Sequence, residues 1–254
     1  MYPVNKNCLK FLLAFFLQVL LVQPLTAQEI HLPQDSLQLV TVINDHWDDT
    51  TAVMRRFQRE NPQQKWVEVG QPVPVNLGRT GLAWGSSPLM DTTRLEGKRK
   101  QEGDGRSPAG LFPFLQAFGH PAPPSGYGEK NLPFLTVDQE QCVDDGKSAY
   151  YNQIVRPDEV GGVTWNSAET MKIDLYEMGL VVGHNCPKAK PGMGSCIFFH
   201  LERGPGKPTA GCTSMKRRDL RALLLWLKAD KHPVVIQLPK KEFQKRQKTL
   251  KVGD

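Results

Sequence analysis

The sequence has few long apolar stretches, no internal repeat and no low-complexity tract. Beyond residue 27, no apolar run approaches the roughly 20 residues that a membrane-spanning helix needs. No RNA- or DNA-binding motif is present, and the formal net charge of +6 is too small an excess to indicate nucleic-acid binding. These absences argue against an integral membrane protein, a repeat array and a nucleic-acid-binding protein.

The N-terminal residues follow the order of a secretory signal peptide. Lys6 and Lys10 form a short basic start, residues 11–22 are apolar with one exception, and a helix breaker then precedes a small-residue exit. We predict a signal peptide over residues 1–27, cleaved after Ala27, and a location in the periplasm or cell envelope. The alternative is an uncleaved tether, although an apolar run of about 12 residues is too short to span a bilayer. Cleavage would remove two lysines and no acidic residue, leaving a net charge of +4.

Cysteine is sparse, with five in the whole chain, and Cys8 lies inside the predicted signal peptide. The other four are an even number, which in an oxidising compartment is typical of two disulfides. A catalytic cysteine would instead have to remain a free thiol. If Cys212 is free, one disulfide would join two of Cys142, Cys186 and Cys196, and the sequence does not decide which two.

The composition, with 39% hydrophobic and 23% charged residues, is that of an ordinary globular domain. Short runs rich in β-branched residues predict strands. The main expected strands are residues 37–43, 65–69, 73–77, 180–182, 196–201 and 234–238. Helical spacing of apolar residues predicts helices over residues 51–59, 167–171 and 216–228, the last with Ser214 as its N-cap. The expected fold class is mostly β with peripheral helices.

Two segments differ in composition from the rest. Residues 91–135 are dense in Gly and Pro, and we expect long loops around short strands there, with four large apolar side chains buried. These are Phe112, Phe114, Leu115 and Phe118. Residues 240–254 form a basic C-terminal tail, which is either solvated or in contact with an anionic wall polymer. The predicted globular domain spans residues 28–239.

The candidate chemistry lies in residues 196–214. If residues 196–201 form a strand, Cys196, Phe198 and His200 share one face, because side chains alternate. Cys212 follows His200 by twelve residues and precedes the predicted helix, whose N-terminus would stabilise a thiolate and lower the pKa of the thiol. A nucleophile, a neighbouring base and a turn rich in backbone N–H groups are what acyl transfer through a thioester requires.

Two other interpretations use the same residues. A histidine beside an apolar strand is commonly structural, and a cysteine is commonly part of the core or of a disulfide. A zinc site is the second alternative, although none of the candidate ligands has the usual paired spacing. Those candidates are His184, Cys186, Cys196, His200 and Cys212.

Two separated blocks of the sequence are similar to blocks of a known family. Residues 192–200 (GMGSCIFFH), followed by residues 208–212 (PTAGC), resemble the active-site block of the L,D-transpeptidase (YkuD-type) catalytic domain. Residues 102–113 (EGDGRSPAGLFP) resemble the other recurrent stretch of that domain. Residues 142–152, together with Trp165, resemble a divergent Gram-negative branch of the family. The likeness runs from about residue 36 to residue 238.

The resemblance implies a β-sandwich or open barrel with helices at its edges, and a cysteine peptidyltransferase that needs no metal or organic cofactor. Cys212 would attack the substrate and His200 would accept the thiol proton. The remaining predicted oxyanion- or substrate-binding residues are Gly211, Thr213, Ser195 and Arg106. His184 with Asn185 would orient the base or play a structural part, and the aromatic residues Tyr150, Tyr151 and Trp165 would stack on sugars or be buried.

The implied substrates are peptidoglycan stem peptides, as both donor and acceptor, processed by a monomeric enzyme. Attack on the third residue of a tetrapeptide would release D-alanine, and a second stem amine would then form a 3-3 cross-link. With water as acceptor the enzyme would be an L,D-carboxypeptidase. A catalytically silent peptidoglycan-binding module is the alternative from another class.

The sequence departs from the usual family motif at two positions. Ala210 stands where many members have a second histidine, and Ser214 stands where they have an arginine. That arginine is a natural partner for a substrate carboxylate, because its planar fork binds both oxygens. In its absence, Arg79, Arg106 or Arg203 would have to serve.

Overall fold

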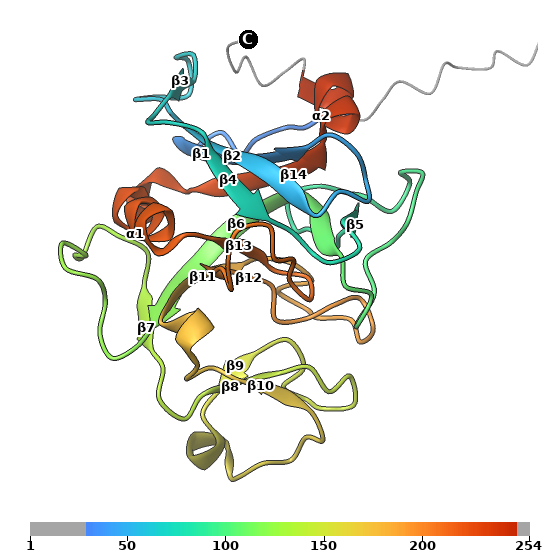
Figure 1. The fold of residues 1–254 in the computed structure, drawn as a ribbon, viewed down its shortest axis with the longest axis vertical. Helices are drawn as coiled ribbons and strands as arrows, with labels where there is room; N and C mark the ends of the chain where they lie inside the picture. The colour runs from blue at the N-terminus through green and yellow to red at the C-terminus, as the bar shows by residue number, and fades with distance from the viewer. Residues whose placement is uncertain (1–28, 248–254) are drawn as a thin grey trace, which may run out of the picture.

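The computed structural model describes residues 29–247, and the predicted signal peptide lies outside this range. Most strands belong to one sheet whose path closes on itself (Figure 1). In spatial order its main strands are β1 (Gln38–Asn44), β14 (Val234–Pro239), β6 (Ser107–Gly119), β11 (Met178–Val182), β12 (Phe198–Leu201), β13 (Thr213–Met215), β4 (Val73–Asn76) and β2 (Thr51–Gln58). Because β2 also pairs with β1, this sheet is a barrel. The expectation of a mostly β, barrel-like fold is confirmed.

Shorter elements extend the barrel. Strand β3 (Val67–Glu68) pairs with β2, and both β5 (Leu82–Trp84) and β7 (Phe134–Thr136) pair with β6. Within the described residues there are two α-helices, α1 (Arg217–Trp226) and α2 (Lys240–Arg246). They lie at the periphery of the barrel (Figure 1). None of the helices in this range is long and apolar enough to cross a membrane.

A second sheet lies apart from the barrel, at the bottom of Figure 1. It has three short strands in the order β10 (Ala168–Thr170), β8 (Gln141–Val143) and β9 (Ile154–Val155). We call it the small sheet. The 3₁₀ helix η2 (Asp174–Tyr176) leads from it back to β11.

The core falls into two clusters that follow the alternation along β12. Ile197, Phe199 and Leu201 belong to the main barrel core, which also takes up the buried leucines of α1. Cys196 and Phe198 point the other way, into a smaller cluster with Cys142, Tyr176 and Cys212. The predicted alternation of faces over residues 196–201 is confirmed, and the second face is where the candidate nucleophile lies.

The helix predicted over residues 51–59 is wrong, because this segment is strand β2. Its burial alternates over most of its length, with Ala52 and Met54 buried while Val53 is exposed. The backbone N–H of His46 donates to the Asp49 carboxylate at 2.7 Å, so Asp49 stabilises the turn between β1 and β2. Pairing with both β1 and β4 outweighs the helical spacing, which is a weak signal over so short a segment.

The loops expected over residues 91–135 are also a partial error. Residues 107–119 form β6, which with 13 residues is the longest strand in the described part of the chain. Pro108 and Pro113 have no backbone N–H to donate, but both still accept hydrogen bonds through their carbonyls. The Pro113 carbonyl accepts from Gly183 N–H at 2.8 Å, and the Pro108 carbonyl accepts from the Gln237 side chain at 2.9 Å. The three phenylalanines are buried as expected, whereas Leu115 is 44% exposed.

Two further helix predictions need correction. The helix expected over residues 167–171 is strand β10, held by pairing with β8. The helix expected at residues 216–228 is present as α1, but its N-cap is Lys216 and not Ser214. Residues 240–246 of the predicted basic tail form helix α2, which lies against β14 and β1, and residues 248–254 lie outside the described residues.

Candidate active site

A pocket of about 310 Å³ opens between the barrel and the small sheet. Both Cys212 and His200, the predicted nucleophile and base, line it. The other lining residues are Glu169, Thr170, Ile173, Leu175, Tyr176, Arg203, Lys207, Pro208, Thr209, Ala210 and Ser214. Residues from β10, η2, β12 and β13 therefore meet at one site, although they are far apart in the sequence.

Strand register explains why the thiol and the imidazole share this pocket. β12 and β13 run parallel, with Phe199 beside Thr213 and His200 beside Ser214. Cys212 precedes Thr213 by one residue, so side-chain alternation places it on the face of His200. The side chain of Thr213 points to the opposite face, where its hydroxyl donates to Gln237 Oε1 at 2.7 Å.

Two hydroxyl groups fix the peptide of Cys212. Ser107 Oγ and Thr209 Oγ1 both donate to the Cys212 carbonyl, at 2.9 and 2.6 Å. Thr209 Oγ1 also accepts from Gly211 N–H at 3.1 Å. At Gly211 the backbone has φ 157°, and a Cβ would lie 3.1 Å from the Arg106 carbonyl, so glycine suits this position.

The thiol of Cys212 is in an unfavourable setting for a resting thiolate. Burial raises its pKa well above the usual value, and the charge of Glu169 raises it further. Phe198 N–H, which donates to Sγ at 3.3 Å, acts in the opposite direction. Helix α1 begins five residues later, at Arg217, so the expected helix-start position of Cys212 is wrong. The expected low pKa of this thiol is also wrong, because the effect of desolvation outweighs the hydrogen bond from Phe198.

His200 is held as a neutral imidazole with a defined tautomer. Burial lowers its pKa to about 4. Its Nδ1 lies 2.8 Å from the Leu201 carbonyl, and since a carbonyl only accepts, Nδ1 carries the hydrogen. Nε2 is then left with the lone pair that a general base needs. The Tyr176 ring packs edge-on against the imidazole at 5.3 Å, which restricts its orientation.

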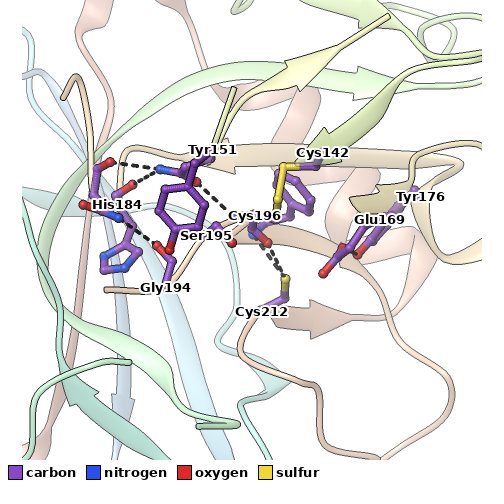
Figure 2. Close-up of a disulfide and its surroundings, with 12 residues drawn as sticks. Cys142, Tyr151, Glu169, Tyr176, His184, Gly194, Ser195, Cys196 and Cys212 are labelled. Carbon is purple, nitrogen blue, oxygen red and sulfur yellow. Dashed lines mark hydrogen bonds between the residues drawn. A yellow bond between two sulfur atoms is a disulfide. The ribbon is translucent and has the colours of Figure 1, made fainter. Parts of the chain in front are cut away.

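Within residues 29–247 one disulfide forms, between Cys142 of β8 and Cys196 before β12 (Figure 2). Cys186 and Cys212 are free thiols, so the interpretation with two disulfides is wrong and Cys212 is available as a nucleophile. Cys196 cannot ligate zinc while it is bonded to Cys142, and no cluster suited to a metal ion occurs within residues 29–247. The disulfide joins the small sheet to the strand that carries His200.

The other predicted site residues lie outside the pocket lining. Ser195 donates to Glu102 Oε2 at 2.8 Å, and the Tyr151 hydroxyl donates to the same oxygen at 2.6 Å. Arg106 binds the Leu82 carbonyl at 2.8 Å and the Asp48 carboxylate at 2.7 Å. Their predicted parts in substrate binding stay predictions.

Of the three arginines considered for the substrate carboxylate, Arg203 lines the pocket, together with Lys207. Arg79 donates to the Gly103 carbonyl at 3.2 Å instead. Ala210 and Ser214, the positions that depart from the usual family motif, both line the pocket. The smaller, uncharged side chains at these two positions, compared with the usual histidine and arginine, therefore alter the pocket itself.

Four residues that shape the site were not among the site residues predicted from the sequence. Ser107 and Thr209 lie inside the two family-like blocks, so the blocks were the available signal. Glu169 and Tyr176 had none, because they are brought to the thiol only by the small sheet and η2. The Tyr176 hydroxyl donates to Glu169 Oε2 at 2.6 Å.

A buried thiol and a neutral imidazole face one pocket of a β-barrel, an arrangement typical of cysteine-dependent acyltransferases and hydrolases. The family model of the L,D-transpeptidase catalytic domain (YkuD) matches residues 49–236. The chain therefore belongs to the YkuD L,D-transpeptidase family. No curated protein and no solved structure matches the chain.

Proposed function

We propose that this protein is a cysteine peptidyltransferase that joins peptidoglycan stem peptides through a thioester on Cys212. The observation that carries the proposal is the shared pocket of Cys212 and His200 in a chain of this family. The donor is a stem tetrapeptide, and the acceptor is the amine of a second stem, which gives a 3-3 cross-link.

The resting site is a neutral pair, because burial raises the pKa of Cys212 and lowers that of His200 to about 4. Proton transfer must therefore accompany attack. His200 Nε2 takes the proton from Sγ as the sulfur bonds to the carbonyl carbon of the third residue, and the imidazolium then protonates the departing D-alanine amine. Nδ1–H keeps its bond to the Leu201 carbonyl throughout, which holds the ring in place.

The second half-reaction runs in reverse order. The acceptor amine attacks the thioester carbonyl while His200 removes its proton, the Cys212 thiolate leaves, and the imidazolium returns the proton to the sulfur. Water in place of the amine would give an L,D-carboxypeptidase, which is the second candidate. A pocket lined by Arg203 and Lys207 supports recognition of a peptide carboxylate in either case.

We also propose that the protein acts in the periplasm or cell envelope. The signal-peptide pattern of residues 1–27 supports export. The Cys142–Cys196 disulfide supports it independently, since such bonds persist in oxidising compartments and are rare in the cytosol. Cell fractionation with an antibody against the protein tests this, and recovery in the cytosol alone would contradict it.

The test of activity is incubation of the purified mature protein with disaccharide-tetrapeptide, with products identified by mass spectrometry. A cross-linked dimer establishes transpeptidation, and a tripeptide establishes carboxypeptidase activity. Cys212→Ala should abolish either product, while Cys186→Ala, which removes the other free thiol, should leave it unchanged. Wild-type protein that leaves the tetrapeptide intact would overturn the proposal.

A further inference from the structure

The small sheet places a carboxylate beside the candidate nucleophile. Glu169, on β10, lines the same pocket as Cys212, and Tyr176 donates to its Oε2 at 2.6 Å. In Figure 2 the Glu169 and Tyr176 side chains lie together on the side of the Cys212 sulfur that faces the small sheet. Tyr176 also packs against His200 and Phe198, at 5.3 and 5.5 Å between ring centroids, so the Glu169 carboxylate is held by a fixed partner.

This carboxylate is electrostatically costly where it lies. Among residues 29–247, no lysine, arginine or histidine forms an ion pair with Glu169. Burial raises its pKa, with further contributions from the charges of Asp144 and Glu102. Its negative charge in turn opposes thiolate formation at Cys212. A thiol–imidazole pair alone gives no reason for an acidic group at this place.

Cations occupy other parts of the same pocket lining. Arg203 and Lys207 come from the loop after β12, whereas Glu169 comes from the small sheet. The pocket therefore presents both charge signs without pairing them to each other. A ligand that carries an ammonium group and a carboxylate would satisfy both.

We propose that Glu169, oriented by Tyr176, binds a primary ammonium group of the donor peptide beside the Cys212 thiol. This rests on the proposed function, and it assigns the specificity of that site to donors with a free side-chain amine near the scissile carbonyl. The ammonium belongs to the donor and not to the acceptor, because an amine held in its charged form has no lone pair with which to attack a thioester.

Through Glu169, recognition of the substrate is coupled to activation of the Cys212 thiol. A bound ammonium neutralises the charge that opposes ionisation of Cys212, so the correct donor eases the loss of the thiol proton. The other ionisable groups around the thiol are Tyr176, His200, Arg203, Lys207 and Lys100. None of them is a carboxylate, so Glu169 is the group whose neutralisation has this sign.

The first experiment measures binding without turnover, in Cys212→Ala protein, by calorimetry. The ligands are disaccharide-tetrapeptide with a free side-chain amine and the same compound with that amine acetylated. We expect acetylation to weaken binding about 10- to 100-fold, and the added substitution Glu169→Gln to remove the difference. Glu159→Gln, an exposed carboxylate near the small sheet and outside the pocket, is the matched control and should keep the difference. A difference that survives Glu169→Gln overturns the proposal.

The second experiment needs no peptidoglycan and separates this proposal from the proposed function. In a Cys186→Ser background, the rate of Cys212 alkylation by iodoacetamide is followed against pH, with and without cadaverine as a probe. We expect Glu169→Gln to lower the apparent pKa of the thiol, and cadaverine to lower it in the protein with Glu169 only. Equal profiles with and without Glu169 overturn the proposal even if the tetrapeptide is processed. The expected shifts support it even if the tetrapeptide is not a substrate.

Discussion

The barrel and the small sheet are stabilised in different ways. Barrel strands have as many as 13 residues, pair with neighbouring strands around a closed path and enclose a continuous apolar core. Strands of the small sheet have two or three residues, and the sheet is attached through the Cys142–Cys196 disulfide and side-chain hydrogen bonds. The barrel carries the Cys212 thiol and the His200 imidazole, whereas the small sheet carries the Glu169 carboxylate. On our proposals, reactivity is built into the rigid part and selectivity into the attached part.

Mild acid should separate the two regions most strongly, because two neutral imidazoles are buried on the barrel side. Burial lowers the pKa of both His184 and His200 to about 4 from 6.5. Between these values the unfolded chain binds protons that the folded chain does not, so stability falls as pH falls. We expect a loss of about 3 kcal/mol per imidazole from pH 7 to pH 4.

Next to the small sheet, the pH dependence of stability appears only at lower pH. Hydrogen bonds from Asn166 and Lys147 lower the pKa of Asp145 below 3.8, so its contribution is present above that value and is lost only as pH falls further. Urea unfolding between pH 7 and pH 3 measures both effects. His200→Phe should remove about half of the loss above pH 4, and a free energy of unfolding that stays constant from pH 7 to pH 4.5 would contradict the prediction.

Truncation in the barrel core should have the next largest effect. Phe112 of β6 is 1% exposed, and Phe112→Ala should cost about 4 kcal/mol, because it removes transfer free energy and leaves a cavity. Leu115→Ala on the same strand removes a side chain that is 44% exposed and should change stability by less than about 1 kcal/mol. Similar losses for the two variants in urea unfolding would show that the core does not lie where the structure puts it.

Removal of the disulfide tests how far the small sheet depends on it. Cys142→Ala with Cys196→Ala opens a loop with a sequence separation of 54, and we expect a loss of about 3 kcal/mol. The loss should be local: amide hydrogen exchange should accelerate in β8, β9 and β10 and stay slow in β1 and β14. Cys186→Ala is the control, because it leaves the disulfide intact. Uniform acceleration across the barrel would show that the two regions unfold as one unit.

Single hydrogen bonds should give the smallest effects, of similar size in both regions. In the small sheet, Trp165→Phe removes the bond from Nε1 to Gln141 Oε1, and beside the barrel, Tyr127→Phe removes the bond from the hydroxyl to the Leu132 carbonyl. The lost bond should cost about 1 kcal/mol in each variant, and the smaller ring at the buried Trp165 should add about 1 kcal/mol. Thermal unfolding measures both, and a loss at Trp165 several times larger than that at Tyr127 would mean that the small sheet relies on this bond more than on its disulfide.

The family, the mostly β fold and the two residues that face the pocket could all be predicted from the amino-acid sequence. Cys212 and His200 line one pocket because both lie within short blocks of the sequence, where strand register decides which side chains share a face. Local patterns failed where long-range pairing competes with them, as in residues 51–58, 107–119 and 168–170. The strand ladder supplies hydrogen bonds and burial that no window of neighbouring residues records.

The electrostatics of the site could not be predicted from the sequence, because they arise from contacts between distant segments. Whether Cys212 has a low or a raised pKa depends on burial and on Glu169, which is 43 positions away in sequence. The choice of Cys142 and Cys196 as the disulfide pair depends on the approach of β8 to the start of β12. Desolvation and charge act through space, so they become defined only when the small sheet is seated against the barrel.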